Sequence, residues 1–237
     1  TVDMPQNSAA IQFKTFVNKS TKGASDDITN DKFDAFQVWG LKSTDGQPVK
    51  PFEGTLVSKD AQNNTWSYET PVYWEAGCNY SFVAIAPTTA IGTSAIFTQP
   101  TAVGQYGTIT FENGDGTTDL IYDGDGTWAT TAVTEGTCPN AINFTFNHLL
   151  SRVKFAFTNG MDDGSTINVT NVQITNANTK GIATLSENTA TWTLAEDNNT
   201  AALEFGNVLD AEQEYEANET KATDHKYMIP EAGADAY

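Results

Sequence analysis

The sequence predicts an all-β protein, and three patterns support this fold class. No long stretch of the 237 residues repeats apolar side chains at the spacing of an amphipathic helix. Short apolar segments recur instead about every ten residues between turn-forming residues, which is typical of a β-sandwich. The clearest alternation of apolar and polar residues runs from Ile142 to Phe157.

That central stretch changes phase halfway along. Large apolar residues occupy even-numbered positions from Ile142 to Phe146 and odd-numbered positions from Val153 to Phe157. A slip of one residue turns every side chain of a strand to the other face, so one regular strand cannot hold both phases. We therefore expect two strands that meet near residues 147–151, with a bend or a domain boundary between them. Arg152, the only arginine of the chain, follows at once.

The first half of the chain holds the longest apolar segments. Phe33–Leu41 is apolar on both faces and Tyr80–Ala86 is almost continuously apolar, so both are expected to be buried central strands. Trp66–Tyr68 and Val72–Trp74 flank Pro71 and are expected to pair as strands. Shorter strands are predicted at Ala10–Val17, Gly54–Ser58, Thr108–Phe111 and Thr118–Tyr122, with a turn at Asp45-Gly46 and a long loop over 87–106.

The second half is built from shorter segments. Strands are predicted at Ile167–Thr175, Gly181–Leu185, Ala190–Leu194, Ala202–Phe205 and Lys226–Pro230. Residues 212–219 form an acidic run with too few apolar positions for a helix, and we interpret them as a loop. The predicted division places one sandwich at residues 1–147 and a second, smaller one at residues 148–237.

The charge of the chain excludes several kinds of partner. Twelve Lys and Arg against 30 Asp and Glu give a formal charge of −18, which opposes binding to nucleic acid and to anionic membrane surfaces. We favour solubility as the role of this charge. No window has the apolar length of a membrane span or the pattern of a signal peptide, so an exported protein would have lost its signal.

Catalytic chemistry is not indicated. His148 and His225 are the only histidines, and the chain has no H-E-x-x-H, G-x-S-x-G or glycine-rich phosphate loop. His148 continues the alternation of the phenylalanine face, which favours a structural role. We therefore predict no enzyme, no catalytic residues and no cofactor.

Carboxylates among glycines raise the question of a metal. Asp115, Asp119 and Asp123 stand in a glycine-rich run, and carboxylate oxygens on a tight loop are what Ca²⁺ requires. The EF-hand spacing is absent, and Asp-Gly pairs are common in turns, so we favour turns and predict no metal.

Two further features carry site predictions. Cys78 and Cys138 are the only cysteines; in an exported chain they could form one disulfide, and the alternative is buried thiols. Trp128 lies in a Gly/Thr-rich loop and is the candidate for an exposed glycan-binding platform, whereas Trp66 and Trp74 are expected in the core.

Several short motifs occur together. Residues 146–153 read FNHLLSRV, and upstream stand Trp66-Ser67-Tyr68-Glu69, Val72-Tyr73-Trp74, Tyr80-Ser81-Phe82-Val83-Ala84 and Asp119-Leu120-Ile121-Tyr122. In this order and spacing they resemble the fimbrillin family of surface proteins of Bacteroidetes, over roughly residues 11–157 and less clearly to residue 230.

The resemblance implies a fold and a function. It implies two tandem transthyretin-like Greek-key β-sandwich domains in a structural or adhesive subunit of cell-surface fimbriae, or pili. It further implies export as a lipoprotein to the outer-membrane surface, removal of an N-terminal strand, and head-to-tail assembly with other fimbrial subunits by strand insertion. Receptors on host or bacterial surfaces are further expected partners.

The chain departs from the family pattern in three places. Residue 1 is threonine rather than a lipidated cysteine, and no arginine precedes Arg152 to direct an arginine-specific maturation cut. The second domain of the family continues past the element that matches Lys226–Pro230. We leave two explanations open: an unpaired sheet edge that accepts a strand from another chain, or a truncated sequence.

The sequence also allows an alternative function. A surface carbohydrate-binding lipoprotein of tandem sandwiches would use an exposed aromatic platform, with Trp128 as its favoured member. A hydrolase is a third hypothesis, for which the sequence offers no constellation of residues.

Overall fold

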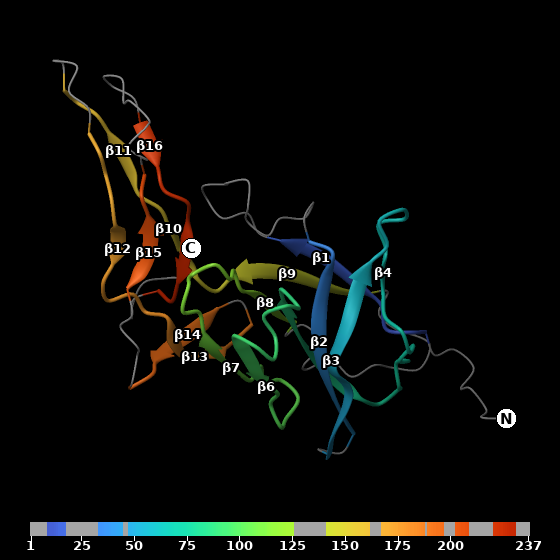
Figure 1. Cartoon of the computed structure of the whole chain (residues 1–237). Coiled ribbons are helices and arrows are strands. Elements are labelled where there is room, and N and C mark those ends of the chain that lie inside the picture. Colours follow the sequence, from blue (N-terminus) through green and yellow to red (C-terminus); the bar gives the residue numbers. More distant parts are fainter. Residues whose placement is uncertain are drawn as a thin grey trace.

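The computed structural model describes residues 9–17, 33–44, 47–125, 141–161, 167–187, 189–196, 202–208 and 220–230. Across these ranges the regular structure consists of strands, as the sequence predicted (Figure 1). The described part of the chain contains no helix that could cross a lipid bilayer.

The largest element is a seven-stranded sheet. Its neighbours are antiparallel except for β1 and β9, which run parallel. The sheet curls so far that its two outermost strands, β1 and β4, contact each other. In spatial order it contains β1 (Phe13–Val17), β9 (Ile142–His148), β8 (Ile121–Asp125), β5 (Asn79–Ala86), β2 (Ala35–Thr44), β3 (Gln47–Lys59) and β4 (Trp66–Ser67).

Strand β5 lies in the middle of this sheet and is buried on both faces. Alternate side chains of a strand point to opposite faces, so one strand can contribute to two cores. Tyr80 and Phe82 enter an aromatic core inside the curled sheet, whereas Val83 and Ile85 enter a second core on its other face. The continuous apolar run that predicted a buried central strand is explained by these two cores.

A four-stranded sheet covers the second core. Its order is β14 (Ala190–Leu194), β13 (Lys180–Leu185), β7 (Thr108–Glu112) and β6 (Ala95–Thr98), with every pair antiparallel. Strands β7 and β13 therefore pair across the predicted division at residues 147 and 148, and Tyr227 and Ile229 also enter this core. The division into two tandem domains stays a prediction.

Three short two-stranded ladders complete the described fold. They are β10 (Ser151–Val153) with β17 (Lys226–Met228), β11 (Ala156–Thr158) with β16 (Thr220–Ala222), and β12 (Val172–Ile174) with β15 (Leu203–Gly206). A small cluster around Ala177, Leu203 and Phe205 lies between them. Figure 1 shows these ladders grouped apart from the seven-stranded sheet.

The predicted change of strand near residues 147–151 is confirmed. Strand β9 ends at His148 and β10 begins at Ser151, so the even and odd apolar phases lie on separate strands. The bend between them is held at Leu149, whose N–H donates to the Leu120 carbonyl at 2.9 Å and whose carbonyl accepts from Trp192 Nε1 at 3.0 Å.

Three predicted elements differ from the structure. Residues 87–106 are not all loop, because they contain the edge strand β6. Its apolar residue Ile96 is 57% exposed, so the strand lacks the regular alternation of apolar and polar residues that indicates a buried face. Trp66–Tyr68 and Val72–Trp74 do not pair with each other: β4 pairs with β3, and Tyr73 pairs with Ala10. The strand predicted at Ile167–Thr175 is confined to β12, where a bulge follows Val172.

Two other predictions fall on residues outside the described ranges. The loop over residues 212–219 and the turn at Asp45-Gly46 both lie there. The β2–β3 hairpin ends with the pair Thr44 and Gln47, which leaves two residues for the connection.

Candidate functional site at the first strand

The segment 9–17 has two different backbone partners along its length. Near its start it runs antiparallel to residues 72–74: Ile11 N–H donates to Val72 O at 2.8 Å, and Trp74 N–H donates to Ala9 O at 3.1 Å. From Gln12 onward it runs parallel to β9, beginning with Ile142 N–H donating to Gln12 O at 2.7 Å. The segment thus joins two parts of the sheet that are far apart in sequence.

The side chains of this segment alternate between core and solvent. Ile11, Phe13 and Val17 are buried, whereas Gln12 and Lys14 are exposed and Phe16 is 53% exposed. This is the period of two expected of a strand with one buried face. The strand predicted at Ala10–Val17 is therefore found, although its regular part begins at Phe13.

Phe13 is surrounded by rings of the aromatic core. Its ring lies 5.5 to 6.2 Å from the rings of Phe36, Phe52, Tyr68, Phe82 and Phe144 (ring centroids). Three of these pairs are edge-on and one is stacked, which are the favoured arrangements of aromatic rings. An edge strand therefore supplies a central side chain of this core.

Tyr68 fixes the backbone where the segment changes partner. Its hydroxyl donates to Ile11 O at 2.6 Å and accepts from Val72 N–H at 3.3 Å. Burial raises the pKa of Tyr68 above its usual value of 10.0, so the hydroxyl stays protonated and keeps its donor role. Tyr68 and Ile11 are 57 positions apart in the sequence, so no local sequence pattern could predict this hydrogen bond.

The three aspartates of the glycine-rich run, Asp115, Asp119 and Asp123, make separate structural contacts. Asp115 accepts from the N–H and hydroxyl of Thr117, at 3.0 and 2.8 Å, and these bonds lower its pKa. Asp123 accepts from Thr145 N–H at 2.7 Å, between β8 and β9. No group of three metal-ligating side chains occurs in the described ranges.

His148 and Asp119 form a buried pair. Nδ1 of His148 lies 3.0 and 3.2 Å from the two carboxylate oxygens of Asp119, and both side chains are less than 10% exposed. The pair fastens the end of β9 to the segment before β8, next to the bend at Leu149. This placement agrees with the structural role expected of His148.

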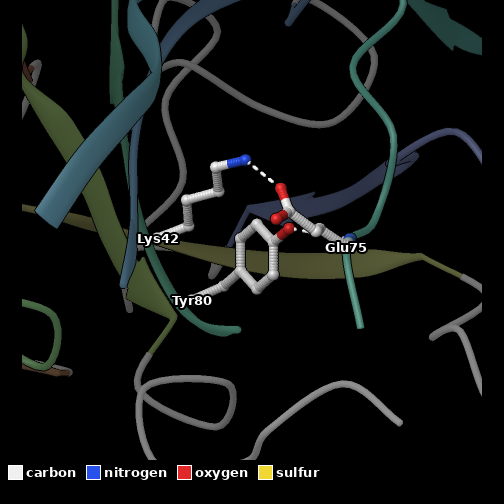
Figure 2. A network of polar contacts seen from close by, with 3 residues as sticks. All are labelled: Lys42, Glu75 and Tyr80. Atoms are coloured by element: carbon white, nitrogen blue, oxygen red, sulfur yellow. Dashed lines mark hydrogen bonds and ion pairs between the residues drawn. The ribbon is translucent and has the colours of Figure 1, made fainter. Parts of the chain in front are cut away.

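Cys78 lies beside a polar network at the entrance to β5. It is fully buried, and Cys138 lies outside the described residues, so the disulfide between them stays a prediction. Lys42 forms an ion pair with Glu75, and Tyr80 Oη accepts from Glu75 N–H at 2.9 Å (Figure 2). Lys42 lowers the pKa of Glu75 below its ordinary value of 4.5 by hydrogen bonding and by its charge.

One small pocket lies on the described surface beside β2 and β5. It encloses about 160 Å³ including space open to solvent, below the roughly 300 to 1,000 Å³ of common ligand sites. Its walls include Trp39, Val83 and Gln99, with Gln99 Nε2 already donating to Gly40 O at 3.1 Å. Trp128, the predicted glycan platform, lies outside the described residues, and that function stays a prediction.

Comparisons with known proteins agree with the all-β fold. A family model described as fimbrillin-like matches residues 21–237. A search among curated proteins found no match. The crystal structure of a candidate adhesin from Bacteroides thetaiotaomicron is similar over 96% of this chain and 73% of that chain, with a TM-score of 0.50 and 12% sequence identity. At this identity the likeness establishes the all-β fold alone.

Proposed function

The chain belongs to the fimbrillin-like family, and we propose that it is a fimbrial subunit that joins its neighbours by exchange of the strand in the β1 position. Family membership supports a structural, fimbrial or adhesive role rather than an enzymatic one. Strand exchange, the identity of the partners and a position at the outer-membrane surface belong to the proposal, as does export as a lipoprotein.

The observation that carries the proposal is the construction of β1. It is a five-residue edge strand, the only parallel neighbour among the paired strands of the described sheets, yet it inserts Phe13 into the centre of a core. Strand β1 pairs with β9 alone and the residues before it bridge to residues 72–74, so the segment 9–17 can leave without breaking the pairs between other strands. Its departure would uncover both an apolar groove and the hydrogen-bonding edge of β9.

An uncovered groove of this kind favours a replacement strand. Exposing the rings that surround Phe13 to water is costly, because each buried aromatic side chain contributes about 2 to 3 kcal/mol through its apolar surface. A strand from a second subunit would restore both the ring contacts and the hydrogen bonds of β9. When donor and acceptor surfaces lie on different parts of the subunit, this contact repeats head to tail and produces a fibre.

Limited proteolysis of the full-length protein tests the proposal. The N-terminal region of about 25 residues is removed, and samples taken before and after are compared on an unboiled SDS gel and by negative-stain microscopy. We expect a heat-labile ladder and thin fibres only after trimming, since strand-exchanged interfaces are very stable. A monomer in both samples would overturn assembly by exchange at β1 and leave a non-polymerising adhesive role.

A further inference from the structure

Building on the proposed function, we infer that the β1 position selects its occupant by one aromatic anchor, at the place now held by Phe13. The segment that fits this position is an extended peptide of the form aliphatic–x–aromatic–x–small–x–aliphatic. In this chain the pattern is supplied by Ile11, Phe13, Thr15 and Val17.

The anchor position is enclosed by aromatic rings. Phe13 contacts five rings from β2, β3, β5, β9 and the segment after β4, so its pocket is closed on several sides. Thr15 is only half-buried, which leaves a shallow middle position. Ile11 and Val17 mark the ends of the buried face, each about 1% exposed.

The backbone contacts carry no such selectivity. Ile142 N–H, Tyr68 Oη and Trp74 N–H all donate to carbonyl groups of the segment, and any residue can provide a carbonyl. The N–H groups of the segment do impose a condition, because the N–H of Ile11 donates to Val72 O at 2.8 Å, a parallel ladder such as that of β1 with β9 uses N–H groups of both strands, and proline has no N–H. In strand addition generally, main-chain bonds supply affinity and side-chain pockets supply specificity.

The direction of the occupant is also fixed by this arrangement. Its first residues must run antiparallel to residues 72–74, and its later residues must run parallel to β9, with the change at the position of Gln12. An occupant in the opposite direction would not match both sets of donors. The outward positions impose no requirement, since Gln12, Lys14 and Phe16 are exposed.

A strand-replacement assay on the whole chain tests the anchor. The substitution Lys22→Arg introduces one cut site for an arginine-specific protease, because Arg152 is the only natural arginine and is half-buried in β10. The nicked protein retains all of its residues. Fluorescent peptides with the sequence of residues 9–17 are then added in excess, and their uptake is followed by anisotropy.

Four peptides separate the requirements of the groove. The parent peptide and the Phe16→Ala peptide are expected to enter equally well. The Phe13→Ala peptide is expected to bind about 100-fold more weakly, as losing a buried phenylalanine ring implies, and the Ile11→Pro peptide about 10-fold more weakly.

The outcomes distinguish the anchor from strand exchange itself. Entry of the Phe13→Ala peptide at parent strength would overturn the anchor and leave the proposed function intact. If no peptide binds, although the trimmed protein gives the ladder, strand exchange takes place elsewhere and the anchor is overturned. Failure of every peptide without a ladder would overturn both. As a second measurement, Phe13→Ala and Phe16→Ala are each placed in the nicked chain, and retention of its cut N-terminal segment is compared; equal retention in the two variants would contradict the anchor.

Discussion

Strands β1 and β5 contribute side chains to the same aromatic core but are held in different ways. Seven of the eight residues of β5 are buried, and the strand pairs with β2 on one edge and β8 on the other. In β1 only Phe13 and Val17 are buried, and the strand pairs with β9 alone. The rings of Phe13 and Phe82 nevertheless lie 6.2 Å apart.

The comparison shows that burial of a side chain does not by itself fix a strand in place. Removing β5 would break two strand pairings and open two cores, whereas removing β1 with the residues before it breaks one strand pairing and one short bridge, and opens one core. Local opening is expected to follow this difference, since regions with fewer buried contacts and fewer protected hydrogen bonds open at lower cost. A fold can therefore contain a well-packed strand that opens at lower cost than its neighbours.

The largest effect is expected in β5. Phe82→Ala removes a side chain with 1% exposure that contacts the rings of Phe13, Phe52, Trp74 and Tyr80. The free energy of unfolding, measured with denaturant, is expected to fall by about 3 to 5 kcal/mol. Leu56→Ala, at an exposed position of β3, is the control, with a change within about 0.5 kcal/mol. A loss below about 1 kcal/mol for Phe82→Ala would contradict this account.

Phe13→Ala is expected to act locally. Hydrogen exchange of the Ile11 and Ile142 amides, which bond across the edges of the first segment, should accelerate by roughly 100-fold. The amides of β5 should exchange as slowly as in the parent protein, because β5 stays paired when β1 opens. Phe16→Ala supplies the matched control in the same strand, with no expected change. Equal acceleration in β1 and β5 would mean that the two strands open as one unit.

A smaller effect is expected where β2 supports β5. A methyl group at Gly40 would lie 2.9 Å from Cδ2 of Phe52 and 3.2 Å from Cδ1 of Phe82. Gly40→Ala therefore forces both rings to move away from residue 40. The expected loss of stability is about 1 to 3 kcal/mol, measured by thermal or chemical unfolding. Gly114→Ala, where nothing lies within 4 Å, should change stability much less. Equal losses in the two variants would rule out ring displacement as the cause.

The smallest effect concerns the ion pair at the entrance to β5. Lys42 holds the pKa of Glu75 below 4.5 in the folded state, so the pair stabilises the fold above that pH and this contribution is lost as pH falls through the lowered pKa. Lys42→Ala should return the pKa of Glu75 toward 4.5 and remove that part of the acid sensitivity. NMR titration of Glu75 measures the shift, and an unchanged titration would show that Lys42 is not its cause.

The sequence predicted the strands whose side chains follow a strong local pattern. The continuous apolar run of β5 and the change of phase after β9 were both sufficient for correct predictions. Strand β6 was not predicted because it is a short edge strand. Only Ala95 and Phe97 point toward the core, and Ile96 and Thr98 are exposed, so the alternation spans too few residues to be recognised.

The pairing of distant strands could not be predicted from local patterns. Nothing in the period of residues 108–112 indicates that they pair with residues 180–184, and Tyr73 pairs with Ala10 rather than with its sequence neighbours. The same limit applies to the candidate site. Alternation predicted a strand at residues 10–17, but the five rings around Phe13 come from segments up to 131 residues away.

The parallel pairing of β1 and β9 has a mechanical consequence. Tension that pulls the beginning of β1 away from the end of β9 acts along the strand axis, so the hydrogen bonds between them are loaded together in shear. An antiparallel hairpin pulled at its open end is instead loaded one bond at a time and unzips. The anchor ring of Phe13 would resist the same sliding motion, because it must leave its pocket before the strand can move by a residue pair.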